Sequence, residues 1–364
     1  MTSQSDNMID NTSDPTHPVD PFSLTFEQLE ALVRSLGGQR SHALRWFRHL
    51  QRTGEPSPQA LPHLGRALTS RLEALTAPSR VQLQLVQAGA DGTRKLQFLL
   101  ADGALVEAVL IPDKSRMTLC LSSQAGCAMG CRFCATASMG LRRNLTAGEI
   151  MGQFRLARAQ AQEGVSNIVF MGMGEPLHNW PAVRDAIAIL KDPNGINFSR
   201  RRITVSTCGV VPRMEAVVRE ARVGLAISLH ATEDAARTDL IPLNQRWPMT
   251  QVLSEARRLA LEHDGTVMIQ YLLLAGKNDS ISHARQLAEL VADFPCHVNL
   301  LTYNPVSGLP FHTPTREALQ AFKSELLGRG IRVYHRESRG VDVNGACGQL
   351  ALVSARGSEN TCSI

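Results

Sequence analysis

The stretch that decides the fold is Gly126-Cys127-Ala128-Met129-Gly130-Cys131-Arg132-Phe133-Cys134, in which three cysteines follow the spacing C-x3-C-x2-C. Three thiolates can bind three irons of a [4Fe–4S] cubane and leave the fourth iron without a protein ligand. Such an open iron can take the amino and carboxylate groups of S-adenosylmethionine (SAM), so that an electron reaches the sulfonium. We therefore predict that Cys127, Cys131 and Cys134 hold a cluster that starts radical chemistry by cleaving SAM.

A zinc site is the alternative interpretation of these cysteines. Structural zinc is usually closed by four ligands, commonly arranged as paired C-x2-C units. The stretch contains one such pair, and Cys120, which could supply a fourth ligand, is expected to lie in a β-strand. The spacing therefore favours the cluster over zinc.

The composition of the chain is that of a globular protein. It has 364 residues, of which 43% are hydrophobic, enough for one large domain and a small one. No apolar run reaches the roughly 18 residues of a membrane span, and the polar N-terminus lacks the features of a secretory signal. We expect a cytoplasmic protein without a membrane partner. In that compartment crowded cysteines indicate metal or catalytic groups rather than disulfides.

The charge is unevenly distributed along the chain. The net charge is +5, and residues 1–20 contain four Asp but neither Lys nor Arg, so the remainder is more basic than the whole. A basic body suits a polyanion such as RNA, although many cytoplasmic proteins are mildly basic without binding nucleic acid. The first helical region holds seven arginines that form either a solvated face or an RNA contact: Arg34, Arg40, Arg45, Arg48, Arg52, Arg66 and Arg71.

Five regions are expected along the chain. They are a disordered tail over residues 1–20, a helical accessory domain over 21–80, a β-hairpin extension over 81–112, the core over 113–354 and a tail over 355–364. In the extension, Asp91-Gly92 and Asp102-Gly103 separate three predicted strands, which are residues 81–86, 95–100 and 105–111.

The core alternates strands with helices. Strands are predicted at residues 117–122, 167–171, 202–206, 224–229, 266–274 and 297–303. Helices are predicted after the capping box Thr146-x-x-Glu149 and at residues 181–190, 250–262 and 282–292. Six parallel strands with interposed helices indicate an α/β fold, a (β/α)6 barrel that is closed or, as we expect, partial. In such a barrel the chemistry lies on loops after the C-terminal ends of the strands.

Candidate cofactor contacts recur at these strand ends. The second strand ends in residues 171–176, Met-Gly-Met-Gly-Glu-Pro, where Gly174 lets the backbone approach a ligand and Glu175 can accept hydrogen bonds from the amino group of SAM. Later strands end in Ser206, in Ser228-Leu229-His230 and in Asn304. Each alone is as easily a cap or turn residue, but their recurrence favours a cofactor site. The remaining thiols Cys208, Cys296 and Cys362 are interpreted as packing or tail cysteines.

Two further thiols lie outside the cysteine motif. Cys347 stands in the glycine-flanked stretch Gly345-Ala346-Cys347-Gly348, after the last barrel elements, and Cys120 lies in the first core strand. A flexible segment of this kind can carry a nucleophilic thiol to the barrel mouth. A buried structural cysteine is the alternative, and spacing alone does not decide between the two.

Several of these stretches together resemble the RlmN/Cfr family of radical SAM RNA (adenine-C) methyltransferases. They are residues 122–136, 144–150, 171–176, 205–212, 227–231 and 346–350, and the likeness runs from about residue 22 to residue 353. The combination of the cysteine motif with Ala346-Cys347-Gly348-Gln349-Leu350 is more specific than either part alone.

The resemblance implies a SAM-dependent methyltransferase that uses two SAM molecules per turnover. One SAM methylates Cys347, and a second is cleaved at the cluster to a 5′-deoxyadenosyl radical, which takes a hydrogen atom from that methyl group. The methylene radical adds to an adenine carbon of RNA, and Cys120 then resolves the adduct through a transient disulfide with Cys347. Glu107 matches the proposed proton acceptor. The matching SAM contacts are Gly174, Glu175, Ser206, Ser228, Leu229, His230 and Asn304.

This scheme explains why two thiols are needed. An aromatic adenine carbon is not nucleophilic, so polar methyl transfer from SAM cannot reach it, whereas a radical can add there. The covalent adduct must then be resolved, which requires a second thiol.

The resemblance also implies the partners. They are large-subunit (23S) rRNA and, in some members, tRNA, with methylation at C2 rather than C8, together with a reductase or flavodoxin-type electron donor; we expect a monomer. Residues 340–345 depart from the run usual in the family, and Cys208 stands where Ser is usual. Two other functions stay open, namely a radical SAM enzyme with a different substrate and a zinc-containing RNA-binding protein.

Overall fold

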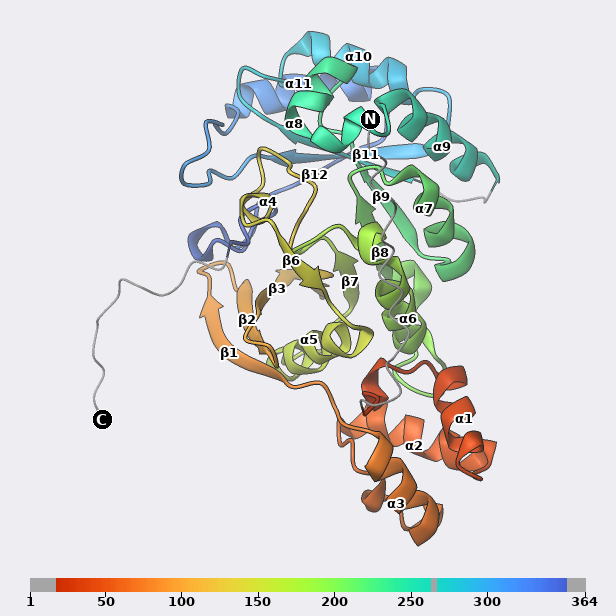
Figure 1. Cartoon of the computed structure of the whole chain (residues 1–364). Helices are drawn as coiled ribbons and strands as arrows, with labels where there is room; N and C mark the ends of the chain where they lie inside the picture. Colours follow the sequence, from red (N-terminus) through yellow and green to blue (C-terminus); the bar gives the residue numbers. More distant parts are fainter. Residues whose placement is uncertain (1–17, 263–266, 352–364) are drawn as a thin grey trace, which may run out of the picture.

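The computed structural model describes residues 18–262 and 267–351 (Figure 1). One large sheet contains, in order of pairing, β1 (Val81–Ala88), β2 (Arg94–Leu100), β3 (Leu105–Asp113), β4 (Arg116–Cys120), β7 (Asn167–Phe170), β8 (Ile203–Thr207), β9 (Gly224–Ser228), β10 (Val267–Leu273), β11 (Cys296–Thr302) and β12 (Val333–Arg336). A second sheet pairs β5 (Gln124–Gly126) with β6 (Leu141–Asn144). Within the described ranges no pairing joins β1 to β12, so the large sheet is an open barrel.

The direction of the strands divides the large sheet in two. Pairing is parallel from β4 through β12, which confirms the predicted parallel core. The strands β1, β2 and β3 pair antiparallel with one another, and β3 pairs antiparallel with β4. The extension is therefore continuous with the barrel sheet, and its side chains can take part in a site inside the barrel.

The partial (β/α)6 barrel carries one strand more than expected. A helix follows each of the six predicted strands, and β12 adds a parallel strand at the edge. Its four residues alternate between half-buried and exposed without an apolar run, so the hydrophobic pattern gave no signal for it.

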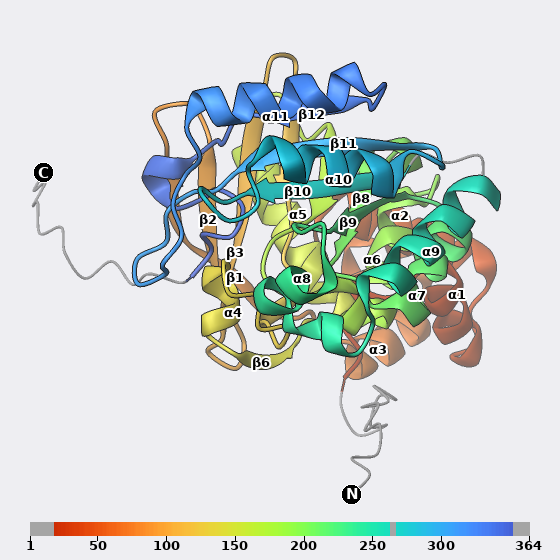
Figure 2. The same cartoon turned by 90° about the horizontal axis from the view of Figure 1, so that it is seen from above.

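The helices between the core strands lie mostly where they were predicted. They are α4 (Ala135–Ser138), α5 (Ala147–Gln160), α6 (Trp180–Lys191), α7 (Val211–Ala216), α8 (Asp234–Leu240), α9 (Met249–Glu262), α10 (Ile281–Val291) and α11 (Arg316–Gly328). The predicted capping box opens α5, because Thr146 Oγ1 accepts from the Glu149 N–H and the Glu149 carboxylate accepts from the Thr146 N–H. Figures 1 and 2 show α6, α7, α9, α10 and α11 on the outside of the curved sheet.

The N-terminal helices α1 (Phe26–Ser35), α2 (Arg40–Thr53) and α3 (Arg66–Leu75) form a small unit beside α6 (Figure 1). The side chains of Trp46 and Phe47 are fully buried in its core. Gln28 Nε2 donates to Asp185 Oδ2 on α6 at 3.3 Å, which joins the unit to the barrel.

Part of the predicted N-terminal tail has defined contacts. The Val19 N–H donates to the carbonyl of Leu75 at 2.8 Å, and the side chain of Asp20 accepts from the Phe22 N–H at 2.9 Å. The expectation of disorder is therefore wrong for these two residues, because backbone pairing and capping hold them. Residues 1–17, the tail over 355–364 with Cys362, and residue 266 lie outside the described residues.

Cross-strand register places several polar residues on one face of the sheet. Paired residues share a face and the faces alternate along each strand. The row Lys95, Val109, Cys120, Val169 and Thr204 crosses β2, β3, β4, β7 and β8. By the alternation, Glu107 and Ser206 lie on this same face, which we term the inner face, and the pairs Ser206–Ala226 and Gln270–Ser228 continue it onto β9 and β10.

Candidate active site

The hairpin of β5 and β6 presents the three cysteines on residues 127–140, which we term the cysteine loop. Gly126 has a φ of +82°, and a Cβ there would lie 1.9 Å from the carbonyl oxygen of Gly140. The Cys127 N–H donates to that same oxygen at 2.9 Å. Only glycine permits this approach, and it closes the loop at its base.

The three thiols lie close enough to interact electrostatically. Burial raises the pKa of Cys127 to about 12 and that of Cys131 well above its usual value, and the charge of Cys134 acts in the same direction on both. In the described part of the chain, no three His, Cys, Asp or Glu side chains converge on a position for a single metal ion. A cubane binds each thiolate through a different iron, so three thiols spread along one loop fit a cluster.

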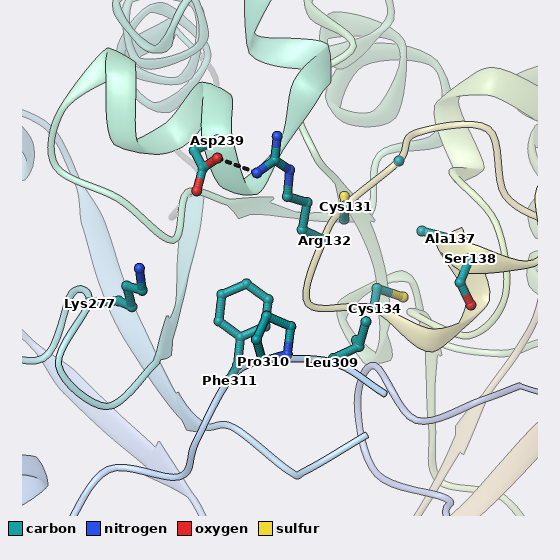
Figure 3. Close-up of a pocket in the computed structure, with 11 residues that line it drawn as sticks. Cys131, Arg132, Cys134, Ala137, Ser138, Asp239, Lys277, Leu309, Pro310 and Phe311 are labelled. Carbon is teal, nitrogen blue, oxygen red and sulfur yellow. Dashed lines mark hydrogen bonds and ion pairs between the residues drawn. The ribbon is translucent and has the colours of Figure 1, made fainter. Parts of the chain in front are cut away.

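The cysteine loop borders a pocket of about 470 Å³ (Figure 3). Cys131 and Cys134 line it, together with Arg132, which forms an ion pair with Asp239, and with Lys277. The rest of the wall is formed by Gly130, Ala137, Ser138, Leu309, Pro310 and Phe311. The pocket is of a size that takes small-molecule ligands, and it carries charges of both signs, because Asp239 lines it as well.

Glu175 lies beside the cysteine loop, as its strand-end position predicted. Its two carboxylate oxygens accept from the N–H groups of Leu177 at 3.0 Å and Cys208 at 2.9 Å. Burial raises the pKa of Glu175, while these N–H donors act in the opposite direction. Its charge also raises the pKa values of Cys127 and Cys131, which shows that the carboxylate is near both thiols.

Glycine is required at position 174 because the loop that holds Gln124 approaches the backbone there closely. Its φ is +97°, and a Cβ would lie 2.5 Å from the Cβ of Gln124. The Oε1 of Gln124 accepts from the Glu175 N–H at 2.9 Å. The loop before the cysteines and the end of β7 are thereby fixed to each other.

Ser206 and Ser228 converge on Gln270, a residue that sequence reasoning missed. Ser206 Oγ donates to Gln270 Oε1 at 2.9 Å, and Ser228 Oγ reaches the same oxygen at 3.4 Å. The backbone carbonyl of Gln270 accepts from the Leu229 N–H at 3.0 Å. Gln270 stands in the predicted apolar strand, where only its polarity and its face could have drawn attention to it.

His230 is buried next to the cysteine loop. Its ring meets Phe133 edge to face at a centroid distance of 5.0 Å, and its Nδ1 accepts from the Leu272 N–H at 3.1 Å. Burial lowers the pKa of His230 to about 3, so the imidazole is neutral at physiological pH. Since Nδ1 is an acceptor, Nε2 carries the proton and is the donor available to a ligand. Asn304, which follows β11, is also buried.

Arg237 is a second residue that sequence reasoning missed. Its guanidinium is buried and donates to the carbonyls of Cys208 at 2.6 Å, Ser228 at 3.0 Å and Leu229 at 3.2 Å, and to Asn244 Oδ1 at 2.7 Å. It therefore ties the ends of β8 and β9 together behind the strand-end residues. A single arginine in a short helix is ordinarily a surface residue, so its spacing carried no signal.

Cys120 and Cys347 are brought together although 227 positions separate them in the sequence. The charge of Cys347 contributes to raising the pKa of Cys120, after burial, which shows that the two thiols interact. Both are free thiols, with Cys120 buried and Cys347 exposed. Desolvation of the Cys347 sulfur by the surrounding protein raises the pKa of Cys347 as well, while the positive charge of Arg336 lowers it.

The segment around Cys347 is attached to the cysteine loop. The Ala135 N–H donates to the carbonyl of Gly348 at 2.8 Å, and Thr136 Oγ1 donates to the carbonyl of Leu350 at 2.6 Å. In agreement, the charge of Cys134 is among the causes that raise the pKa of Cys347. The three thiols of the loop and the pair Cys120–Cys347 thus form one site.

The turn between β1 and β2 holds the same segment from its other side. Asp342 Oδ2 accepts from the Ala90 N–H at 2.9 Å, and Asp91 Oδ2 accepts from the Gly340 N–H at 2.9 Å. We term this reciprocal pair of hydrogen bonds the clasp. It lies in the stretch that departs from the usual family run, and it fixes the chain a few residues before Cys347.

Glu107 lies inside the barrel on β3 and forms an ion pair with Lys95 of β2. Lys95 Nζ lies 3.3 Å from Glu107 Oε1, and the side chains are 4% and 1% exposed. Lys95 is a third residue that sequence reasoning missed, because a lysine beside Arg94 in a strand is usually solvated.

The sequence profile of the Radical SAM superfamily matches residues 121–290, a span that contains the cysteine loop and the ends of β7, β8 and β9. The chain is also similar to a crystal structure of a radical SAM methyltransferase from Sphaerobacter thermophilus. The two superpose with a TM-score of 0.85 at 40% identity, over 92% of this chain and 99% of that one. Fold and site are thus those of a radical SAM enzyme, which implies a [4Fe–4S] cluster and SAM.

Curated relatives extend the similarity over almost the whole chain. A protein from Pelobacter propionicus named "Dual-specificity RNA methyltransferase RlmN" is 44% identical over 92% of this chain and 96% of its own length. A protein of the same name from Geotalea uraniireducens is 42% identical over 91% and 96%. The chain therefore belongs to the RlmN family.

None of the described helices is both long enough and apolar enough to span a membrane.

Proposed function

We propose that this chain methylates an adenine carbon of RNA, C2 rather than C8, through an S-methylated Cys347. The names of its relatives, RNA methyltransferases of dual specificity, support RNA as the substrate. We propose 23S rRNA and tRNA as the two substrates, with a flavodoxin-type reductase as electron donor, one copy of the chain as the active unit and the cytoplasm as its location.

The observation that carries this proposal is that Cys347 lies close enough to Cys120 for its charge to affect the pKa of Cys120, and close enough to Cys134 of the loop for the charge of Cys134 to affect its own pKa. A simple radical SAM hydrogen-abstracting enzyme needs only the loop cysteines and a substrate pocket. Two additional thiols within reach of each other are what a covalent adduct with RNA requires, one to form it and one to release it.

We assign the cysteines of the loop to the cluster and the strand-end residues to SAM. A [4Fe–4S] cluster bound by Cys127, Cys131 and Cys134 would supply one electron to a SAM sulfonium. Glu175, Ser206, Ser228 and the Nε2–H of His230 bind and orient SAM at the strand ends, with Gly174, Leu229 and Asn304 lining the same site.

The thiols and Glu107 act on the RNA. Cys347, exposed at the mouth, takes a methyl group on its sulfur from one SAM, and that carbon later becomes bonded to the adenine. Glu107 accepts the proton that the adenine carbon loses. Cys120, as a thiolate, then attacks the Cys347 sulfur, so that a disulfide forms while the electron pair of the breaking sulfur–carbon bond stays on the carbon, which takes up a proton to become the methyl group. The proposed electron donor reduces the disulfide before the next turnover. Two SAM molecules are therefore used per methylated adenine.

The helical unit over residues 21–80 is proposed to contact RNA. Its arginines at positions 40, 45, 48, 52, 66 and 71 are all exposed. These arginine side chains would bind RNA phosphates, so RNA binding through this unit should weaken as the salt concentration rises. We keep the boundaries 21–80, 81–112 and 113–354 as proposed domains.

The function is tested with anaerobically reconstituted protein, SAM, a reductant and transcribed fragments of 23S rRNA and tRNA. Mass spectrometry of the nucleosides should detect 2-methyladenosine with the wild type and none with Cys347→Ala. Cys120→Ala should retain RNA covalently on the protein. Cys296→Ala, which removes a half-buried thiol remote from the site, is the matched control and should behave as wild type. Full turnover by both the Cys347 and the Cys120 variant would show the proposal to be wrong.

A further inference from the structure

The chain between β12 and Cys347 is held by contacts rather than by a long helix or strand. From Arg336, where β12 ends, to Cys347 the structure describes one short element, the 3-10 turn η8 (Val341–Val343). Such a segment would sample many positions if nothing fixed it, because each unrestrained residue keeps its backbone freedom. A disulfide joins residues whose Cα atoms are only about 4.4 to 6.8 Å apart. The contacts that restrain this segment therefore bear directly on the chemistry proposed for Cys347.

The clasp is the restraint on the side before Cys347. Asp342 accepts from the Ala90 N–H and Asp91 accepts from the Gly340 N–H, so each aspartate bonds to the backbone of the opposite segment. The packing around these bonds is tight, because a Cβ on residue 89, a glycine, would lie 2.8 Å from Asp342 Oδ1. The β1–β2 turn thus has a place for this carboxylate that any larger residue at position 89 would fill.

The clasp is connected to the inner face of the barrel through a closed turn. The carbonyl of Gly340 accepts from the Gly345 N–H at 2.8 Å. Gly345 is buried, and a Cβ there would lie 3.5 Å from Val109 Cγ1. Val109 of β3 is directly opposite Cys120 of β4 in register. The turn that the clasp fixes therefore ends beside the strand pair that carries Cys120, two residues before Cys347.

A second restraint follows Cys347. The buried Gln349 accepts from the Ala346 N–H through Oε1 at 3.3 Å and donates through Nε2 to the carbonyl of Pro305 at 3.1 Å. These bonds do not involve the aspartates of the clasp. Removal of the clasp should therefore loosen the thiol on one side without releasing the whole segment from the barrel.

We propose that Asp91 and Asp342 are positioning residues that hold Cys347 within reach of Cys120, so that the clasp sets how fast the disulfide forms and the methylated base leaves. This inference rests on the proposed function. In the step concerned, the Cys120 thiolate bonds to the Cys347 sulfur and the sulfur–carbon bond of the adduct breaks. The electron pair of that bond stays on the carbon, which takes up a proton. Neither aspartate makes or breaks a bond; both act by raising the effective concentration of one thiol at the other.

The clasp is removed in more than one way. Asp342→Ala deletes one acceptor, and its combination with Asp91→Ala deletes both. Gly89→Ala keeps both aspartates but adds a Cβ where the Asp342 carboxylate lies, so it should dislodge that side chain. Asp342→Asn retains an acceptor oxygen and should keep most of the contact. Asp192→Ala is the matched control, because Asp192 Oδ1 accepts from the Asn194 N–H at 2.7 Å just after α6, away from the site.

The first readout needs neither SAM nor RNA. Reconstituted protein is equilibrated anaerobically with reduced and oxidised glutathione, and peptide mass spectrometry measures the fraction that contains a Cys120–Cys347 disulfide. One oxidised glutathione takes up two electrons and two protons from the thiols and leaves as two reduced glutathiones, so the midpoint gives the effective concentration of the thiols. We expect Asp342→Ala and Gly89→Ala to lower this concentration at least about threefold, and the double aspartate variant roughly tenfold. Asp342→Asn and Asp192→Ala should stay within about twofold of wild type.

Combining Gly89→Ala with Asp342→Ala separates the clasp from a general loosening of the β1–β2 turn. If the glycine acts by leaving room for the carboxylate, Gly89→Ala should have no further effect once that carboxylate is gone. Fully additive losses would overturn the assignment. So would a wild-type effective concentration in every clasp variant, or a loss of the same size in Asp192→Ala.

The second readout is the ratio of RNA held covalently on the protein to methylated RNA released. Slow formation of the disulfide should raise this ratio in the clasp variants, whereas general damage to the active site lowers both amounts together. An unchanged ratio in a variant whose thiols have lost effective concentration would also overturn the inference. Failure of the proposed function itself looks different, because wild type would then form the clasp-dependent disulfide with glutathione but neither an RNA adduct nor methylated RNA.

Discussion

Gly174 and Gln124 approach each other so closely that a Cβ at position 174 would lie 2.5 Å from the Gln124 Cβ. The same glutamine accepts a hydrogen bond from the Glu175 N–H, so the contact sets the position of the carboxylate next to the cysteine loop. Two loops that are far apart in sequence therefore depend on the absence of one side chain.

The first prediction concerns this contact. Gly174→Ala must displace Gln124 or Glu175 and adopt a φ of +97° that alanine rarely takes, so we expect SAM affinity to fall at least about tenfold. Equilibrium binding of SAM to the reconstituted protein measures the effect. Gly328→Ala is the control, because a Cβ there meets nothing within 4 Å and the backbone is not left-handed. Equal binding by both variants would contradict the role of the contact.

The second prediction concerns Gln270. Gln270→Met keeps the size of the side chain but leaves Ser206 and Ser228 without their shared acceptor, so the KM for SAM should rise roughly tenfold. We expect kcat to change less, because the amide positions the serines rather than the reacting atoms. Gln270→Glu, which retains an acceptor oxygen, should recover part of the loss. Unchanged kinetics in the methionine variant would mean that the serines are oriented by something else.

The third prediction concerns the two thiols. Iodoacetamide should alkylate the exposed Cys347 well before the buried Cys120, and peptide mass spectrometry after short exposures reports the order. Because the pKa of each thiol is raised, the thiolate fraction is small at neutral pH. The alkylation rate of Cys347 should therefore continue to increase with pH beyond the range of an ordinary cysteine. Faster reaction of Cys120 would contradict the placement of both residues.

The fourth prediction concerns His230. Its pKa is about 3 in the folded chain but near 6.5 when unfolded, so between these values the unfolded state binds the extra proton. Folding stability should accordingly fall as the pH drops below about 6.5, by about 2 kcal/mol at pH 5 relative to pH 8. Urea unfolding of wild type and His230→Gln at the two pH values isolates the contribution, which should be absent from the variant. Equal pH dependence of the two proteins would remove His230 as its source.

Much of the fold was visible in the sequence because the barrel strands are apolar and end in turns. The cysteine loop was visible for a different reason, since three thiols at C-x3-C-x2-C are rare outside metal sites. The hydrophobic pattern could not reveal β12, because its four residues are half-buried or exposed and include no apolar run.

The polar residues inside the barrel were harder to predict. Lys95, Gln270 and Arg237 stand in ordinary strand or helix patterns, and their significance comes from burial and from partners distant in the chain. The register of strand pairing decides whether a strand residue faces the interior of the barrel. A one-residue shift in that register would move every inward-facing side chain to the outer face. The roles of Glu107, Cys120 and Cys347 came from resemblance, and the structure adds that the two thiols interact.

The clasp has a consequence for how the enzyme can change over time. The turn between β1 and β2 forms hydrogen bonds with the chain a few residues before Cys347, and α4 forms hydrogen bonds with the chain just after Cys347. Lengthening the β1–β2 hairpin would therefore displace the Cys347 thiol, just as substitutions next to Cys347 would. Hairpin and thiol segment should therefore vary together, so grafting one without the other from a related sequence would misplace the sulfur.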